Sequence, residues 1–151
     1  MTLPDPYHLN RFLSAQESCF SQALRELEQG QKQSHWMWFI FPQIAGLGRS
    51  AMAVRYAISS TEEARAYLQH EILGDRLRIC ARALLAHHDK SIRAIMGQPD
   101  DMKLRSSMTL FAELSEQESV FHQVIQLFYA GEKDPLTLSR IKAASSRLDP
   151  T

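Results

Sequence analysis

The chain has 151 residues and a mass of 17.3 kDa, and it is 44% hydrophobic and 23% charged. This size and balance are typical of one globular domain with its own core, and they exclude an intrinsically disordered chain. Seventeen basic residues offset seventeen acidic ones, so no overall positive field favours nucleic acid or an anionic membrane surface as a partner.

The sequence also predicts where the protein works. It has neither the basic start and apolar run of a signal peptide nor the roughly 18 apolar residues of a transmembrane helix. The two cysteines, Cys19 and Cys80, have no second thiol nearby, which argues against a disulfide framework and a metal clip. We therefore expect a cytoplasmic protein.

Helical periodicity dominates the first half of the chain. The expected helices span residues 10–29, 51–58, 61–69 and 75–87. Gly30 is placed to end the first helix, and Ser60 and Glu63 have the spacing of a capping box for the third. We expect Gly74 to break the chain before the fourth, and the aromatic segment at residues 35–43 to be irregular.

The second half continues the pattern. The expected helices span residues 91–96, 101–114, a stretch between Ser115 and Gly131, and 136–147. Asp100 and Asp134 are expected N-caps, and Ser115 with Glu118 forms a second capping box. The sequence thus predicts an all-α fold, a single compact domain (1–151) of six to eight helices, with residues 1–9 and 148–151 loosely ordered.

The segment from His35 to Gln43 holds both tryptophans and has two interpretations, a core staple or a recognition surface. Buried indole, imidazole and amide groups need hydrogen-bond partners, so the segment must satisfy polar groups as well as pack. Trp36 and Trp38 either pack in the core or stack on a ligand ring. His35 is either a pocket residue or a structural histidine, and Gln43 either binds a ligand or braces the backbone.

Two further clusters are candidate anion-binding groups. The glycine-rich turn at residues 46–50 either offers backbone N–H groups and the Arg49 guanidinium to an anion or is an ordinary turn. Hydroxyl residues are unusual inside a helix, so Ser106 and Ser107 beside Lys103 indicate either close helix packing or donors that converge on an anionic ligand.

The sequence contains no recognisable catalytic or metal motif, and it leaves open whether the protein is an enzyme. The histidines lack metal-ligand spacing, so we predict no metal and can name no cofactor. If the protein is an enzyme, His35 or Asp101 is the candidate acid–base group, and hydrolysis of a glycosidic or phosphoester bond is the expected reaction class.

Several motifs along most of the chain resemble those of one bacterial family. The matching pieces are Arg11-Phe12 with Ala15-Gln16, His35 to Gln43, Gly46-Leu47-Gly48, Tyr56-Ala57-Ile58, Glu63-Ala64, Tyr67-Leu68, Leu73-Gly74-x-Arg76-Leu77 and Lys103-Leu104-x-Ser106 to Phe111. In these residues the sequence resembles domain of unknown function 1810, whose members are sometimes labelled calpastatin-like. The resemblance implies a compact helical fold and supplies no function.

Three hypotheses follow from the sequence. The first is a helical domain that binds a small anionic or nucleotide-like ligand through Trp36 or Trp38, Gln43, Arg49, Lys103, Ser106 and Ser107. The second is a non-enzymatic interaction or homodimerisation module that presents the aromatic segment to a partner. The third is pure packing, in which His35 and both indoles are satisfied inside the core.

Overall fold

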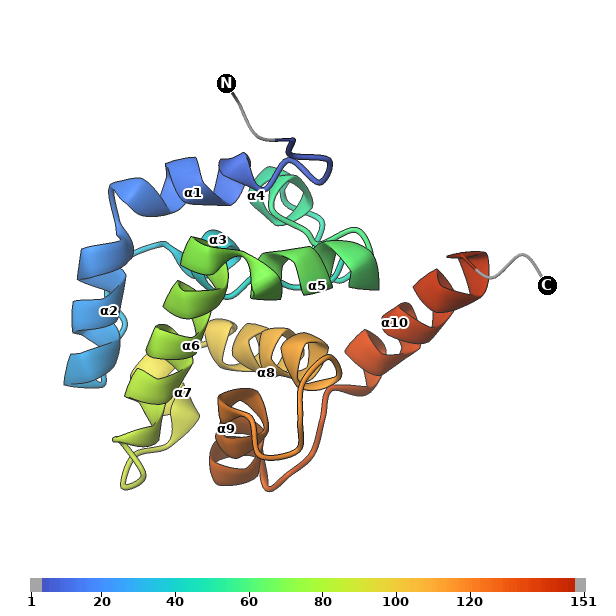
Figure 1. Cartoon of the computed structure of the whole chain (residues 1–151). Coiled ribbons are helices and arrows are strands. Elements are labelled where there is room, and N and C mark those ends of the chain that lie inside the picture. The colour runs from blue at the N-terminus through green and yellow to red at the C-terminus, as the bar shows by residue number, and fades with distance from the viewer. Residues whose placement is uncertain (1–3, 149–151) are drawn as a thin grey trace.

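The structure, a computed structural model, describes residues 4–148, with side chains to residue 143. This part of the chain forms ten helices connected by short loops (Figure 1). They are α1 (Asn10–Glu17), α2 (Phe20–Gln29), α3 (Met37–Ile40), α4 (Ala51–Arg55), α5 (Thr61–Gln69), α6 (Glu71–Leu85), α7 (Ile92–Met96), α8 (Asp100–Ala112), α9 (Val120–Tyr129) and α10 (Pro135–Leu148). The all-α, single-domain prediction is confirmed. The structure has two helices more than the eight expected segments, because residues 10–29 form two helices and α3 adds a single turn.

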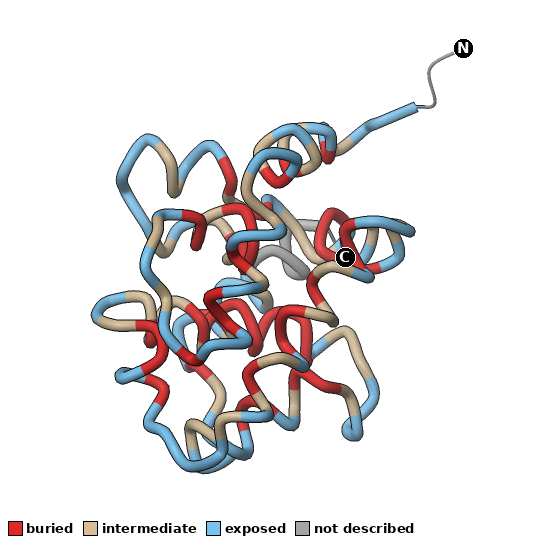
Figure 2. The backbone as a smooth tube through the Cα atoms, turned by 90° about the vertical axis from the view of Figure 1, so that its left-hand side faces the viewer, coloured by how far each residue is buried: buried red, intermediate tan, exposed pale blue. Residues whose placement is uncertain are grey.

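Helix α8 lies at the centre of the fold and packs against α5, α7, α9 and α10 (Figure 1). A chain of aromatic contacts crosses the core through it. Phe12 lies 5.0 Å from Tyr67, Tyr67 lies 5.6 Å from Phe111, and Phe111 lies 5.8 Å from Phe121, measured between ring centres. These four rings, from α1, α5, α8 and α9, are each at most 1% exposed, and burial of such large apolar groups is a main source of stability. Figure 2 shows that the buried stretches of the chain gather in the interior of the fold and the exposed stretches lie around them.

Local signals identified several helix ends correctly. Gly30 ends α2 in the left-handed conformation, with φ of 75°. Ser60 caps α5 by accepting a hydrogen bond from the Glu63 backbone N–H at 3.1 Å, and α5 has the expected bounds. Asp134 caps α10, because its Oδ2 accepts the Thr137 backbone N–H at 3.0 Å.

Three expectations about helix ends were wrong. Asp100 is the first residue of α8 rather than its cap, and its carboxylate forms an ion pair with Lys32 instead. The capping box at Ser115 does not open a helix, because α9 begins at Val120 and Ser119 caps it. Gly74 does not break the chain but lies within α6.

A close approach between backbones explains Gly74. A Cβ atom at this position would lie 2.0 Å from the Leu68 carbonyl oxygen. Glycine therefore lets α6 pack against the last turn of α5. In the sequence, a glycine that allows this close contact cannot be told from a glycine that ends a helix.

The aromatic segment is more regular than expected, because Met37–Ile40 form the single-turn helix α3. Beyond it, the Ile58 backbone N–H donates to the Gln43 carbonyl at 2.8 Å, and the Ala45 N–H donates to the Ile58 carbonyl at 2.8 Å. This isolated bridge closes residues 43–58 into a loop that contains α4.

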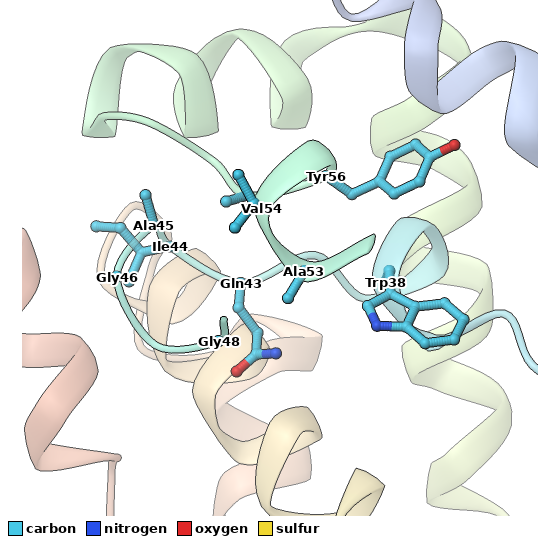
Figure 3. Close-up of a pocket in the computed structure, with 10 residues that line it drawn as sticks. Trp38, Gln43, Ile44, Ala45, Gly46, Gly48, Ala53, Val54 and Tyr56 are labelled. Atoms are coloured by element: carbon cyan, nitrogen blue, oxygen red, sulfur yellow. The ribbon is translucent and has the colours of Figure 1, made fainter. Parts of the chain in front are cut away.

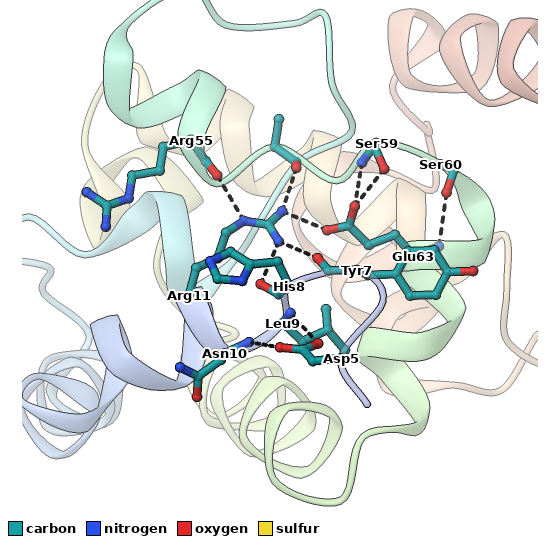
Figure 4. Close-up of polar contacts among 11 residues, drawn as sticks. Asp5, Tyr7, His8, Leu9, Asn10, Arg11, Arg55, Ser59, Ser60 and Glu63 are labelled. Carbon is teal, nitrogen blue, oxygen red and sulfur yellow. Dashed lines mark hydrogen bonds and ion pairs between the residues drawn. The ribbon is translucent and has the colours of Figure 1, made fainter. Parts of the chain in front are cut away.

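An arginine network holds this loop to the N-terminal part of the chain (Figure 4). The Arg11 guanidinium donates to Glu63 Oε2 at 2.7 Å and to four backbone carbonyls at 2.8–2.9 Å. The four carbonyls belong to Tyr7, His8, Arg55 and Ala57. Glu63 Oε1 in turn accepts the Ser59 N–H and hydroxyl, so the network joins α1, α5 and the end of the loop.

Of the terminal segments expected to be loosely ordered, residues 1–3 and 149–151 lie outside the described residues. Residues 4–9 make specific contacts: Asp5 accepts hydrogen bonds from the Leu9 and Asn10 backbone N–H groups at 2.7 and 2.9 Å. None of the helices in the described part of the chain has the length and apolar character needed to cross a membrane.

Candidate functional site

Trp36 is a structural residue of the core. It is 1% exposed, and its indole N–H donates to Glu26 Oε1 at 2.9 Å. The Lys32 ammonium lies 4.9 Å from the centre of its ring, and Phe41 packs against it. With both its face and its N–H group occupied, Trp36 is not available to stack on a ligand.

Trp38 differs from Trp36 in its polar group. The residue is half-buried, yet its indole nitrogen is buried and has no hydrogen-bond partner among the described residues. Trp38 lines a cavity of about 110 Å³ inside the loop of residues 43–58, and the nitrogen lies on the edge of the ring that faces Gln43 and Ala53 (Figure 3). A buried donor without a partner costs about 1–3 kcal/mol, so an acceptor that reached this nitrogen would offset that cost.

A second cavity of about 310 Å³ adjoins the first and shares Gln43 and Gly46 with it. It lies between the loop, the first turns of α8 and the start of α10. Its lining residues are Gln43, Gly46, Leu47, Pro99, Met102, Lys103, Ser106, Asp134, Leu136 and Arg140. The two cavities together bring Trp38, Gln43, Lys103 and Ser106 of the predicted site to one region of the molecule.

Two cations give this region its positive charge. The Lys103 ammonium lies 5.8 Å from the centre of the Trp38 ring and 3.9 Å from Asp100 Oδ1. Asp100 is more closely paired with Lys32, at 2.8 Å, so it neutralises Lys103 weakly. Arg140 lies over Gly46, and its guanidinium is 3.4 Å from the Gly46 carbonyl oxygen. A Cβ atom at Gly46 would collide with this guanidinium, so glycine makes room for it.

One buried carboxylate, that of Asp134, also lines the second cavity. Asp134 is 9% exposed, and its Oδ2 accepts hydrogen bonds from the Ser106 hydroxyl at 3.1 Å and from the backbone N–H and hydroxyl of Thr137. Its Oδ1 has no hydrogen bond within the described part of the chain. The sequence indicated Asp134 only as a helix cap and did not indicate Arg140, because no local pattern connects α10 to Gln43 or Ser106.

Four other predicted residues lie outside the two cavities. His35 is exposed and lines neither of them, and Arg49 is exposed beside Gly48. The Asp101 carboxylate accepts the Met102 backbone N–H at 2.9 Å, a local contact at the start of α8. Ser107 is fully buried, and its hydroxyl has no partner among the described residues. His35 and Ser106 therefore do not face a common cavity.

The described residues contain no group of three or more His, Cys, Asp or Glu side chains placed to hold a metal ion. The chemistry available in the cavities is hydrogen bonding by Gln43, Ser106 and the Trp38 indole, with charge from Lys103, Arg140 and Asp134. This set is suited to binding a charged polar molecule.

The fold and these side chains define a helical domain with two adjoining polar-aromatic cavities. The sequence matches the family described as "Protein of unknown function (DUF1810)" over residues 6–141, and the chain belongs to this family. It is also similar to the conserved hypothetical protein Rv1873 from Mycobacterium tuberculosis, with 46% sequence identity and a TM-score of 0.89. This similarity covers 91% of the chain and 99% of the mycobacterial chain. A comparison with curated proteins finds no significant match.

Proposed function

We propose that the protein binds a small anionic ligand in the two adjoining cavities. The main support for this proposal is that Gln43 lies far in the sequence from Lys103 and Ser106, yet all three line one cavity. Trp38, whose buried indole N–H has no partner, lies beside them. Natural binding sites combine a concave, largely apolar surface with a few polar groups that face one another.

The charges of the site support an anion as the ligand. Lys103 and Arg140 approach the cavity from α8 and α10, so a phosphate or carboxylate between them would meet two cations. Gln43 and the Trp38 N–H supply further donors. An aromatic or sugar part of the ligand would lie in the smaller cavity against Ala53 and Tyr56, as in a nucleotide-like compound.

The alternative, docking of a partner protein through the aromatic segment, has less support. Trp36, Phe39 and Phe41 are all at most 8% exposed, so they offer no aromatic surface. Three exposed hydrophobic residues, Val54, Met102 and Leu136, line the two cavities instead. They place exposed apolar surface at the two cavities, away from the aromatic segment that this alternative requires.

A tryptophan fluorescence titration tests the proposal with inorganic phosphate, ribose 5-phosphate, AMP and ADP-ribose as probes. We expect a saturable change with at least one probe and a Kd about tenfold or more higher in Lys103→Gln, because a charge-assisted hydrogen bond contributes about 1.5–3 kcal/mol. Arg49→Gln is the matched control, because it removes an exposed cation that does not line the cavities. No response to any probe, or equal losses in the two variants, would contradict the proposal.

We also propose that the protein works in the cytoplasm. Cys19 and Cys80 are both free thiols, a state that a reducing compartment maintains. Burial raises the pKa of both thiols, to about 12 for Cys80, which keeps them protonated and unreactive at neutral pH. Fractionation of cells that express the protein, with alkylation of free thiols before lysis, tests the location; recovery of the protein in an oxidising compartment would contradict it.

A further inference from the structure

We infer that Asp134 accepts a hydrogen bond from the ligand, so that the site selects an anion that also carries hydroxyl groups, such as a sugar phosphate, over a simple anion. This inference rests on the proposed function and names the ligand class of the same site. Asp134 is a carboxylate in a cavity that otherwise offers cations and donors. A carboxylate repels a bare anion, and the role of Asp134 as the cap of α10 engages only its Oδ2.

The two oxygens of Asp134 have different surroundings. Oδ2 is saturated, because Ser106 and two groups of Thr137 donate to it. Those bonds fix the orientation of the carboxylate at the start of α10. Oδ1 receives no hydrogen bond from the described residues, although a carboxylate oxygen can accept two. Asp134 lines the cavity, and Oδ1 is its side-chain oxygen that remains free to accept from a bound molecule.

A ligand satisfies this arrangement when it presents an anionic group and a hydrogen-bond donor a few ångströms apart. Lys103 and Arg140 bind the anionic group, and Oδ1 accepts from the donor. A sugar phosphate has this pattern, because its hydroxyl groups are donors and lie within a few bonds of the phosphate. Inorganic phosphate carries its hydroxyl donors on the phosphorus itself, so a phosphate held between Lys103 and Arg140 has no donor a few ångströms away to offer to Oδ1. Hydrogen bonds between a buried carboxylate and a hydroxyl are stronger than neutral ones, which makes Asp134 a specificity determinant.

The variant Asp134→Asn separates recognition from folding. Asparagine caps helices about as well as aspartate, so its side-chain oxygen can keep the bond from Thr137. Its amide NH₂ then replaces Oδ1 in the cavity and turns an acceptor into a donor. Asp134→Ser is the second variant, because serine also caps helices but is too short to place an acceptor at the Oδ1 position. Thermal unfolding monitors whether each variant folds.

Calorimetric titrations of the intact chain with ribose 5-phosphate and with inorganic phosphate test the inference. We expect wild-type protein to bind ribose 5-phosphate at least about tenfold more tightly than phosphate. The difference corresponds to the one hydrogen bond to a charged group that ribose 5-phosphate makes and phosphate does not. In Asp134→Asn the Kd for ribose 5-phosphate should rise about tenfold, whereas the Kd for phosphate should stay the same or fall because the repulsion is gone. Asp134→Ser should show the same two trends.

The outcomes separate this inference from the proposed function. If wild-type protein binds phosphate and ribose 5-phosphate equally, or if Asp134→Asn weakens both to the same extent, the selectivity inference fails and the anion site stands. If neither compound binds and the wider probe panel is also silent, the proposed function fails. Opposite responses of the two probes in a folded Asp134→Asn variant would support the inference, since a general loss of structure would weaken both.

Discussion

The indole N–H of Trp36 donates to Glu26 Oε1 at 2.9 Å, and this hydrogen bond anchors the aromatic segment to α2. The same oxygen accepts the backbone N–H groups of Gln33 and Ser34 at 2.7 and 3.0 Å. One buried carboxylate therefore satisfies the turn after Gly30 as well as the tryptophan. The composition of the aromatic segment predicts that its polar groups need hydrogen-bond partners. For Trp36 this partner is Glu26, on the helix that precedes the segment.

Acid should weaken the fold through Glu26. Burial disfavours the charged form of Glu26, but hydrogen bonds from Ser34, Gln33 and Trp36 outweigh it and lower the pKa from 4.5 to about 2. Because the pKa is lower in the folded state, ionised Glu26 stabilises the fold above about pH 4.5, and this contribution is lost as the pH falls from 4.5 towards 2. The full contribution is about 3 kcal/mol. Urea unfolding at pH 7, 4.5, 3 and 2 measures it.

Two glutamine variants isolate this effect from the other acidic groups. Glu26→Gln should be less stable than wild type at pH 7 and should lose less further stability between pH 4.5 and 2. Glu28→Gln is the control, because Glu28 is exposed on the same helix. It should keep the wild-type pH dependence. A pH dependence in Glu26→Gln as steep as that of the wild type would show that the carboxylate does not carry this stability.

Arg11→Lys should destabilise the protein by about 2–4 kcal/mol. Lysine keeps the charge but has three donors and no planar fork, whereas Arg11 makes five hydrogen bonds, one of them to the buried Glu63 carboxylate (Figure 4). Arg25→Lys, at an exposed position on α2, should change the free energy of unfolding by less than about 0.5 kcal/mol. Urea unfolding of both variants tests this, and a loss below about 1 kcal/mol for Arg11→Lys would contradict it.

The sequence predicted the features that depend on neighbouring residues. Gly30 and Ser60 mark helix ends through contacts within a few positions, and helical spacing of apolar residues follows from burial of one face. The break between α1 and α2 could not be predicted in this way. It falls at Ser18 and Cys19, where neither glycine nor proline interrupts a helical pattern.

Features that depend on distant residues were the ones missed. Four predicted site residues meet at the cavities, but the sequence could not separate Trp38 from Trp36, because the difference depends on Glu26 lying beside Trp36 alone. Asp134 and Ser106 are 28 positions apart, and their contact follows from α10 packing on α8. The sequence thus predicted the types of residue at the site but not which of the candidates lie together there.

Gly74→Ala should destabilise the protein, although the same change inside a helix normally stabilises it by up to about 1 kcal/mol. The new Cβ would lie 2.0 Å from the Leu68 carbonyl oxygen, so α5 and α6 would have to move apart at an expected cost of about 1–3 kcal/mol. Asp75→Ala, at the next and exposed position, controls for helix propensity and should be nearly neutral. Thermal unfolding distinguishes the two, and a Gly74→Ala variant as stable as wild type would show that the backbones can separate freely.

Replacement by phenylalanine should affect stability at Trp36 and ligand binding at Trp38. Trp36→Phe removes a donor from Glu26 and leaves a void in the core, so we expect a loss of about 2–4 kcal/mol in the free energy of unfolding. Trp38→Phe removes a buried N–H that has no partner among the described residues, so no hydrogen bond is lost. We expect the free energy of unfolding to fall by less than about 1 kcal/mol. The substitution should nevertheless weaken binding of ribose 5-phosphate or AMP if the indole donates to the ligand. Urea unfolding and calorimetry of both variants test this pair. A strongly destabilised Trp38→Phe variant would contradict the stability prediction, and one that binds every probe like wild type would show that the indole N–H does not serve a ligand.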